Sequence, residues 1–174
     1  MNDRPHIRNI PLREAQAFAG AVVRALRPLC KRIAVAGSVR RQCVAVHDID
    51  IVCLPHSRDE LLARATERAE LLQDGEQNVR LLARNGITVE LYLAHDGIPD
   101  LLGDLPSNWA SLLVCRTGSK EHNTRLALAA KANGMRWRPY LGVYDTTGRL
   151  LETRTERAVF EAIGVDYKRP RERV

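Results

Sequence analysis

The feature that most constrains the fold is an apolar run headed by two aspartates, Asp48-Ile49-Asp50 followed by Ile51-Val52-Cys53-Leu54. Its β-branched and apolar residues predict a strand over residues 48–54 that is buried within a sheet. Side chains alternate along a strand, so Asp48 and Asp50 share one face while Ile49 points into the core. Such a carboxylate pair needs a positive partner, and divalent cations prefer oxygen ligands. The pair alone also fits an ordinary surface Asp-x-Asp, so the surrounding residues must decide.

A glycine-serine pair ends the strand predicted before this one, over residues 32–36. Gly37 allows backbone N–H groups to approach a phosphate, and Ser38 adds a hydroxyl. Arg40 and Arg41 follow, and one guanidinium can bind two phosphate oxygens at once. These residues indicate a phosphate-binding turn, although a plain strand-to-helix turn with a solvated arginine pair would have the same sequence.

A third acidic residue, Glu90, stands in an alternating segment over residues 87–93. Val89 and Leu91 face one side of the predicted strand, and Glu90 faces the other side together with Thr88 and Tyr92. If this strand lies beside residues 48–54, Glu90 can reach the same metal ion as the aspartates. Otherwise it is an ordinary glutamate on an edge strand.

The remaining patterns predict an α+β fold, in which a mixed sheet has helices on one face and a small α+β lobe follows. We expect helices over residues 11–26, 57–72, 107–114, 119–133 and 155–164. We expect further strands over residues 77–83, 87–93, 137–144 and 149–151, with a loop over 94–106. The break at Thr117-Gly118-Ser119 is the predicted hinge between lobes.

The distribution of charge points to a polyanionic partner. The net charge is +6, and residues 116–138 hold six bases against one acid, Glu121. These bases are Arg116, Lys120, Arg125, Lys131, Arg136 and Arg138. Such a segment suits nucleic acid, because phosphate contacts release counterions, but it also fits a solvated face. The four cysteines lack metal-ligand spacing, which argues against zinc.

Together these motifs resemble a known family. Gly37-Ser38-Val39-Arg40-Arg41 followed by Asp48-Ile49-Asp50 resembles the signature of the nucleotidyltransferase superfamily, Gly-Ser then Asp-x-Asp. The double arginine, and Thr117-Gly118-Ser119 with Asn123, are similar specifically to the family X DNA polymerases, the DNA polymerase beta group. Similarity continues over residues 138–144 and 155–170. The resemblance implies a nucleotidyltransferase-type, palm-like catalytic lobe over residues 1–114 and a nucleotide- and DNA-contacting lobe over 115–174.

The resemblance also implies a role for each matching residue. Asp48, Asp50 and Glu90 would be the catalytic, metal-binding carboxylates. Gly37, Ser38 and Arg41 would hold the phosphates of a nucleoside triphosphate. Its sugar and base would meet Thr117, Gly118, Ser119 and Asn123. The basic residues expected to contact DNA are Lys120, Arg125, Arg136 and Arg138.

The implied reaction is DNA-directed DNA polymerisation by two Mg²⁺ ions, with Mn²⁺ able to substitute. A nucleotide passes to a primer 3′-hydroxyl, pyrophosphate leaves, and the expected setting is short-gap DNA repair. The expected partners are primer-template or gapped DNA and a nucleoside triphosphate. The sequence has no signal peptide and no apolar run long enough to span a membrane, so we expect a cytoplasmic monomer without a membrane partner.

Several residues depart from the family pattern. Glu90 replaces an aspartate, and Thr88 replaces a basic residue two positions before it. Cys115-Arg116 replaces an aromatic pair, and Ala127 replaces an arginine that senses the template. No residues are left for an N-terminal lyase domain, so a minimal form is expected. The alternatives are a nucleotidyltransferase with another acceptor, a template-independent terminal transferase, and a non-catalytic nucleic-acid-binding module.

Overall fold

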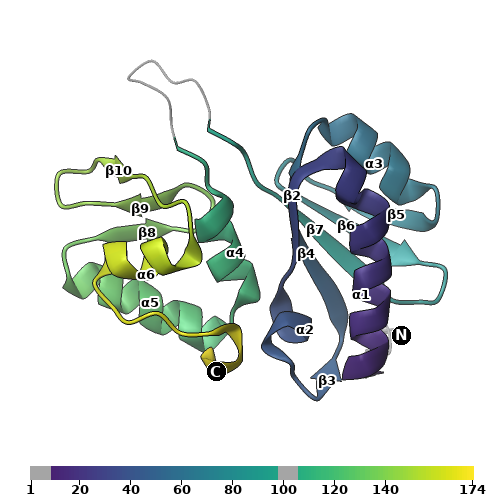
Figure 1. Ribbon diagram of the computed structural model, residues 1–174, viewed down its shortest axis with the longest axis horizontal. Coiled ribbons are helices and arrows are strands. Elements are labelled where there is room, and N and C mark those ends of the chain that lie inside the picture. The colour runs from purple at the N-terminus through teal and green to yellow at the C-terminus, as the bar shows by residue number, and fades with distance from the viewer. Residues whose placement is uncertain (1–8, 98–105) are drawn as a thin grey trace, which may run out of the picture.

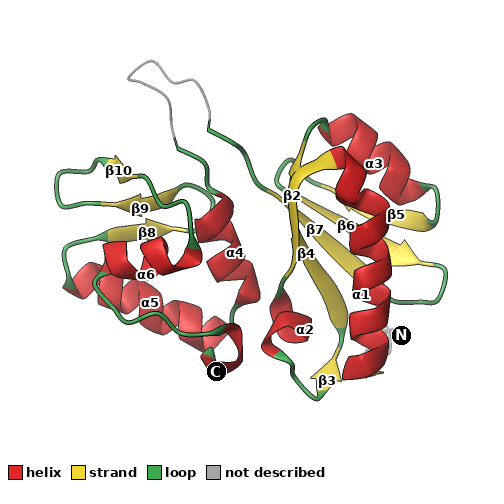
Figure 2. Ribbon diagram, in the orientation of Figure 1, coloured by secondary structure: helices red, strands yellow, loops and turns green. Residues whose placement is uncertain are grey.

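The computed structural model describes residues 9–97 and 106–174, which form two lobes (Figure 1). The short helix α2 (Gly37–Arg41) and helix α4 (Trp109–Thr117) lie where the lobes meet. Both lobes mix helices with strands, so the predicted α+β class is confirmed (Figure 2). Within the described part of the chain, no helix is both long enough and apolar enough to cross a membrane.

The N-terminal lobe is built on a five-stranded sheet with the strand order β2-β4-β7-β6-β5. Its strands are β2 (Cys30–Val35), β4 (Asp48–Pro55), β5 (Ala69–Asp74), β6 (Asn78–Ala83) and β7 (Thr88–Leu93). β4 and β7 run parallel, whereas the other neighbouring pairs are antiparallel. The sheet is therefore mixed, and the predicted hairpin over residues 77–93 is confirmed as β6 and β7.

Two helices, α1 (Leu12–Leu26) and α3 (Arg58–Thr66), cover one face of this sheet (Figure 1). α1 begins directly after Pro11, a residue whose fixed φ suits a helix start. Ser57 caps α3 by accepting a hydrogen bond from the backbone N–H of Glu60. Three short elements complete the lobe: β1 (Ile10–Pro11), which pairs with β3 (Ala45–Val46), and the 3₁₀ turn η1 (Arg27–Leu29).

Alternation along β4 divides its side chains between two cores. Ile49, Ile51 and Cys53 pack in the core beneath α1. Val52 and Leu54 point to the opposite face and belong to a second core, which includes residues of α4. Asp48 and Asp50 share the parity of Val52, so they lie on the face turned toward the C-terminal lobe.

The C-terminal lobe combines three helices with a three-stranded antiparallel sheet in the order β10-β9-β8. Besides α4 it contains α5 (Lys120–Ala132), α6 (Glu156–Ile163), β8 (Arg136–Arg138), β9 (Gly142–Tyr144), β10 (Leu150–Leu151) and η2 (Pro170–Glu172). Ser119 and Thr155 cap α5 and α6 through their hydroxyl oxygens. Gly164 ends α6 in the left-handed conformation, as the sequence predicts.

The structure corrects three predicted boundaries. The helix predicted over residues 57–72 ends at Thr66, and residues 69–74 form the edge strand β5. Helix-forming residues there become a strand because antiparallel pairing with β6 satisfies their backbone groups. The strand predicted over 137–144 is two strands, because Pro139 lies in the turn between β8 and β9. The helix predicted over 107–114 begins at Trp109 and continues to Thr117.

In the predicted loop over 94–106, residues 98–105 lie outside the described residues.

Candidate active site

The turn between β2 and α2 brings Gly37 against the carboxylate of Asp50. Gly37 has φ +56°, and a Cβ atom built on it would lie 1.7 Å from Oδ2 of Asp50. No side chain fits there while Asp50 keeps its position, and positive φ itself favours glycine. The glycine-serine pair and the aspartate pair therefore meet in space, as the sequence predicts.

The two aspartates lie in an electrostatically unfavourable environment. Burial, the charge of Asp48 and the charge of Glu90 raise the pKa of Asp50 to about 7, against smaller opposing effects of Tyr92 and Arg116. Burial and the charge of Glu90 also raise the pKa of Asp48. Like charges held together out of water are typical of sites that bind a cation or transfer protons.

Glu90 lies opposite Asp50 in the parallel pair of β4 and β7, as the prediction requires. Its carboxylate is engaged by neighbours on the sheet. Oε1 accepts hydrogen bonds from Arg80, with Nε at 2.8 Å, and Oε2 accepts one from the hydroxyl of Tyr92. Among the described residues, no group of three His, Cys, Asp or Glu side chains is arranged to hold a metal ion. Glu90 would have to release one of these partners to join Asp48 and Asp50 on an ion.

The arginine pair of α2 divides into two different roles. Arg40 donates to both carboxylate oxygens of Glu156, at 2.8 and 2.5 Å, and to the hydroxyl of Thr117 at 2.6 Å. It therefore ties the N-terminal lobe to α6. Arg41 donates to the backbone carbonyl of Thr117 and lies 2.9 Å from the position of a Cβ on Gly118. Arg41 is the member that reaches the turn expected to contact a nucleotide.

A hollow of about 510 Å³ opens beside this turn. Four residues predicted to bind nucleotide line it together, namely Arg41, Gly118, Ser119 and Asn123. Lys120, Cys115, Arg116, Thr124, Ala127, Trp137 and Pro139 complete the lining. Asn123 holds the end of α4 by donating to the carbonyl of Cys115 at 2.7 Å. The volume lies within the range of small-ligand pockets, so the hollow can accept a nucleoside-sized group.

Ser38 and Thr117 remain outside this hollow. Ser38 follows Gly37 in α2, and its hydroxyl oxygen is buried without a hydrogen-bond partner in the described structure. Thr117 is fully buried, and it accepts from both arginines of α2. An unpartnered hydroxyl beside a glycine turn has free capacity to bind a ligand oxygen.

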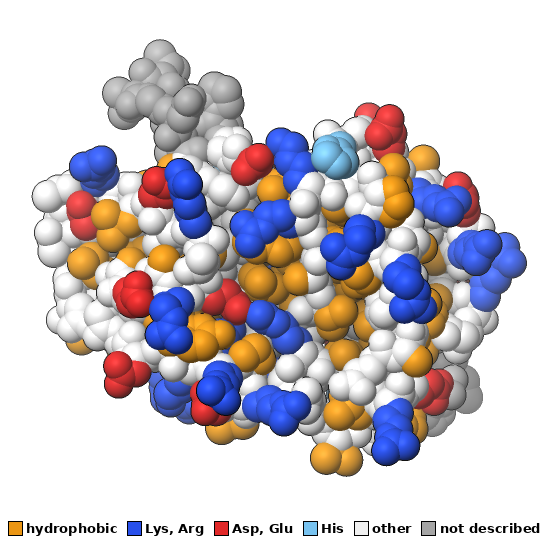
Figure 3. All heavy atoms as spheres, viewed as in Figure 1, with side chains coloured by type: hydrophobic (Ala, Val, Ile, Leu, Met, Phe, Trp, Pro, Cys, Tyr) orange, Lys and Arg blue, Asp and Glu red, His pale blue; other side chains and the backbone are white. Residues whose placement is uncertain are grey.

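The basic residues predicted to bind DNA lie on two elements of the C-terminal lobe, α5 and β8. Lys120 is exposed at the rim of the hollow. Arg125 donates to the backbone oxygen of Val174. Arg136 and Arg138 are exposed on β8, on either side of buried Trp137. On the face shown in Figure 3, Lys and Arg side chains are spread over both lobes, between smaller groups of acidic side chains.

Sequence reasoning missed four residues that shape the site. Arg116 lies over the ring of Tyr92 and donates to the hydroxyl of Tyr140, and Glu156 and Arg173 complete the network around Arg40. Only the position of Arg116, directly before the Thr117-Gly118 turn, is a local signal. The others come from segments far along the chain.

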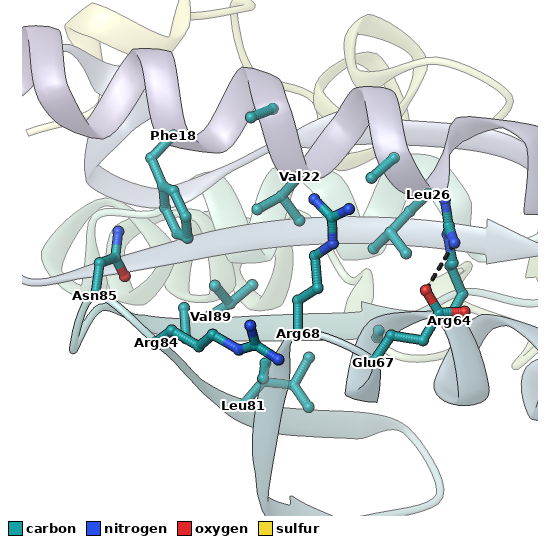
Figure 4. Close-up of a pocket in the computed structure, with 15 residues that line it drawn as sticks. Phe18, Val22, Leu26, Arg64, Glu67, Arg68, Leu81, Arg84, Asn85 and Val89 are labelled. Atoms are coloured by element: carbon teal, nitrogen blue, oxygen red, sulfur yellow. Dashed lines mark hydrogen bonds and ion pairs between the residues drawn. The ribbon is translucent and has the colours of Figure 1, made fainter.

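A larger hollow of about 610 Å³ lies on the opposite face of the sheet, between α1, α3 and the strands (Figure 4). Phe18 and Val22 line it from α1, while Arg64 and Arg68 approach from the end of α3. Its acidic side chain, Glu67, pairs with Arg64 at 2.7 Å. Because β4 turns Asp48 and Asp50 to the other face, this hollow is separate from the candidate site.

Comparison with known proteins places this geometry in context. Residues 112–174 match a family model described as DNA polymerase beta thumb. A sequence search of curated proteins found no match. The fold is similar to Leishmania infantum polymerase beta in a ternary P/T complex, with a TM-score of 0.75 at 17% identity over 96% of this chain and 77% of that one. A ternary gap complex of the same protein gives 0.76 at 16% identity over 95% and 71%. The chain thus has the polymerase beta fold, and its C-terminal segment matches the model of the polymerase beta thumb.

Proposed function

We propose that the chain is a DNA polymerase that transfers a nucleotide to a primer 3′-hydroxyl, with divalent metal ions held by Asp48 and Asp50. The observation that carries the proposal is the contact between Gly37 and the carboxylate of Asp50. It puts a candidate metal ligand directly beside a glycine-serine turn that suits phosphate, as a metal-bound triphosphate requires.

The residues of the site fit a hard divalent cation. Both aspartates offer oxygen ligands, and burial together with the charges of Asp48 and Glu90 raises the pKa of Asp50, so a cation bound there would favour its ionised form. Magnesium ions bound there would help to deprotonate the primer hydroxyl and stabilise the leaving pyrophosphate. Glu90 is the proposed third carboxylate, available when it gives up the hydrogen bond from Tyr92 or Arg80.

The chain's own residues would then bind and orient the substrates. Gly37 offers its backbone to the phosphates, and the free hydroxyl of Ser38 donates to a phosphate oxygen. Arg41 can turn from the Thr117 carbonyl to a phosphate, because guanidinium–phosphate pairs are the stronger interaction. The hollow lined by Gly118, Ser119 and Asn123 receives the sugar and base.

DNA is the proposed acceptor because the similar Leishmania infantum structures are described as ternary P/T and gap complexes. Lys120, Arg125, Arg136 and Arg138 are the proposed contacts to its backbone. The wild-type chain should extend a primed template. Faster extension on a one-nucleotide gap than on an open primed template would support a role in short-gap repair. Binding should weaken steeply as salt rises.

Asp50→Ala tests the proposed reaction. With Mg²⁺ or Mn²⁺ and all four dNTPs, we expect the variant to lose about a thousandfold or more of wild-type primer extension. Asp59→Asn is the matched control, because Asp59 is an exposed acid in the first turn of α3. Helix α3 covers the face of the sheet opposite to the one that carries Asp50. Full extension by Asp50→Ala, or no metal-dependent extension by the wild type, would exclude polymerase activity at this site.

A second candidate is transfer without a template, or transfer of ribonucleotides. The observation that favours it is the small Cys115 side chain in the nucleotide hollow, together with Ala127 on its lining. Extension reactions with NTPs, and with single-stranded DNA, separate the candidates. Equal use of NTPs and dNTPs, or extension of an unpaired strand, would favour this candidate over templated synthesis.

A further inference from the structure

The hollow between α1, α3 and the strands, of about 610 Å³, has apolar walls on two sides (Figure 4). Phe18, Val22 and Leu26 follow one another along one face of α1, at the spacing of a helical turn. Leu81 and Val89 line it from the sheet. Small-molecule sites are concave and mainly apolar, with volumes of about 300–1,000 Å³. The hollow therefore has the size and lining of a site for an apolar group.

The charged side chains of this hollow carry an excess of positive charge. Three arginines and one glutamate line it among the described residues. Arg64 pairs with Glu67 at 2.7 Å. Arg68 and Arg84 are exposed, and within the described part of the chain neither has a hydrogen-bond or ion-pair partner. Two guanidinium groups are thus left at an apolar hollow without an anion.

The strand register brings these two arginines to the same place. Ala69 and Ala83 are partners in the antiparallel pair of β5 and β6. Arg68 precedes the first alanine and Arg84 follows the second, so both stand at the same end of the strand pair. In Figure 4 both side chains extend into the space between α1 and the sheet. Like charges across a strand pair repel each other, and an anion bound between them would remove that repulsion.

We propose that this hollow binds a small amphipathic anion, whose apolar body packs on Phe18 and Val22 and whose carboxylate or phosphate lies between Arg68 and Arg84. A guanidinium group can donate two parallel hydrogen bonds to either kind of anion. A small molecule fits better than a partner protein, because only fifteen residues line the hollow, whereas a stable protein interface takes about 20–30 residues from each partner.

This site is independent of the proposed function. Val89 lines the hollow, while the next residue of β7, Glu90, lies opposite Asp50 and points to the other face of the sheet. Binding in the hollow requires neither a metal ion nor a nucleotide. Loss of polymerase activity in Asp50→Ala therefore says nothing about this site, and failure of this site leaves the proposed reaction untouched.

The direct test is a titration of the full chain with octanoate, octyl phosphate, octanol and octylammonium, followed by carbon–proton NMR of methyl groups. Octanoate or octyl phosphate should shift the methyl signals of Val22, Leu26, Leu81 and Val89, and should bind at least about tenfold more tightly than octanol or octylammonium. The tighter of the two anions identifies the preferred head group. Equal binding of octanoate and octylammonium, or the absence of shifts with both anions, would overturn the proposal.

Arg84→Gln tests the anionic head. Removal of one guanidinium should weaken binding of the preferred anion about three- to tenfold and leave octanol binding within about twofold of wild type. Arg24→Gln is the matched control, because Arg24 is an exposed arginine of α1 that does not line the hollow. Unchanged anion binding by Arg84→Gln, or an equal loss in the control, would contradict the assigned role of the arginines.

Ala25→Leu tests the apolar body by filling the hollow from α1. Ala25 is exposed and lines the hollow, and leucine is nearly as good a helix former as alanine, so the variant should fold. It should weaken binding of the preferred anion and of octanol alike, by at least about tenfold, because the added side chain occupies their space. Ala17→Leu, at an exposed position of α1 outside the hollow, should bind as wild type does. Full anion binding by Ala25→Leu would mean that the anion binds elsewhere, and the site would be wrong.

Discussion

Two clusters of charge flank α2, and they behave in opposite ways. In the first, Asp48, Asp50 and Glu90 gather like charges, and the pKa of Asp50 rises to about 7. In the second, Glu156 lies between Arg40 and Arg173, with Arg173 Nη1 at 2.7 Å. Burial alone would raise the pKa of Glu156, but the hydrogen bond from Arg40 and the charge of Arg173 outweigh it and lower that pKa.

The opposite pKa shifts of Asp50 and Glu156 indicate different roles for the two clusters. Opposite charges that satisfy one another stabilise the fold, and here they join α2 to α6 and to the C-terminal tail. Like charges held together lower stability, and a protein keeps them where a ligand will supply the missing charge. The two clusters share one short helix, whose Arg40 belongs to the stabilising cluster and whose Gly37 is the proposed phosphate-binding residue beside Asp50.

Glu156→Gln should give the largest loss of stability. Arg173 is fully buried, so removing the charge of Glu156 leaves that guanidinium without a counterion, and we expect a loss of about 3 kcal/mol in the free energy of unfolding. Urea denaturation at pH 7.5 measures it, and Glu161→Gln, an exposed glutamate on the same helix, should change it little.

The pH dependence of this loss has a definite sign. The pKa of Glu156 is lowered on folding, so its stabilising effect is full above the ordinary value of 4.5 and disappears as the pH falls through the folded-state pKa. The gap between wild type and Glu156→Gln should therefore close in acid. A gap that stayed constant down to pH 3 would show that packing, and not charge, explains the loss.

Gly37→Ala should have the next largest effect and should damage the like-charge cluster. The new Cβ would meet Oδ2 of Asp50 at 1.7 Å, so the carboxylate or the turn must move, at about 2 kcal/mol beyond the strain of positive φ. Gly148→Ala isolates that strain, because Gly148 has φ +84° with no atom within 4 Å of its Cβ position. Urea denaturation measures the loss in the free energy of unfolding for each variant. Equal losses in the two variants would mean that the carboxylate of Asp50 moves away from the new Cβ without a cost in stability.

How much of these clusters can be predicted from the sequence depends on how local each feature is. The strand carrying Asp48 and Asp50, the capped helix after Ser119 and the Gly37 turn each depend on neighbours in the chain, and each is predicted correctly. The prediction of helix over strand β5 is wrong, because the structure of β5 depends on pairing with β6 rather than on its own residues.

The roles of the arginines show the same limit within the site. Nothing local distinguishes Arg40 from Arg41, yet one pairs with Glu156 and the other reaches the Thr117 turn. The sequence predicts which face of its strand Glu90 shares, but it leaves open whether that strand lies beside β4; the structure shows that it does, with Glu90 opposite Asp50. Nor could the sequence show that Arg80 and Tyr92 donate to the carboxylate of Glu90, because those contacts depend on side-chain rotamers across the sheet.

Asp50→Asn should change stability in the opposite direction, as a gain where the other variants lose. The pKa of Asp50 is raised on folding from 3.8 to about 7, so its ionisation opposes folding increasingly between those values. Without divalent ions and with a chelator present, the variant should be more stable than wild type at pH 8, and by less at pH 5. Asp166→Asn, at an exposed acid, should show no such trend. A loss of stability at pH 8 would mean that Asp50 is already satisfied without a metal ion, and the contrast between the two clusters would fail.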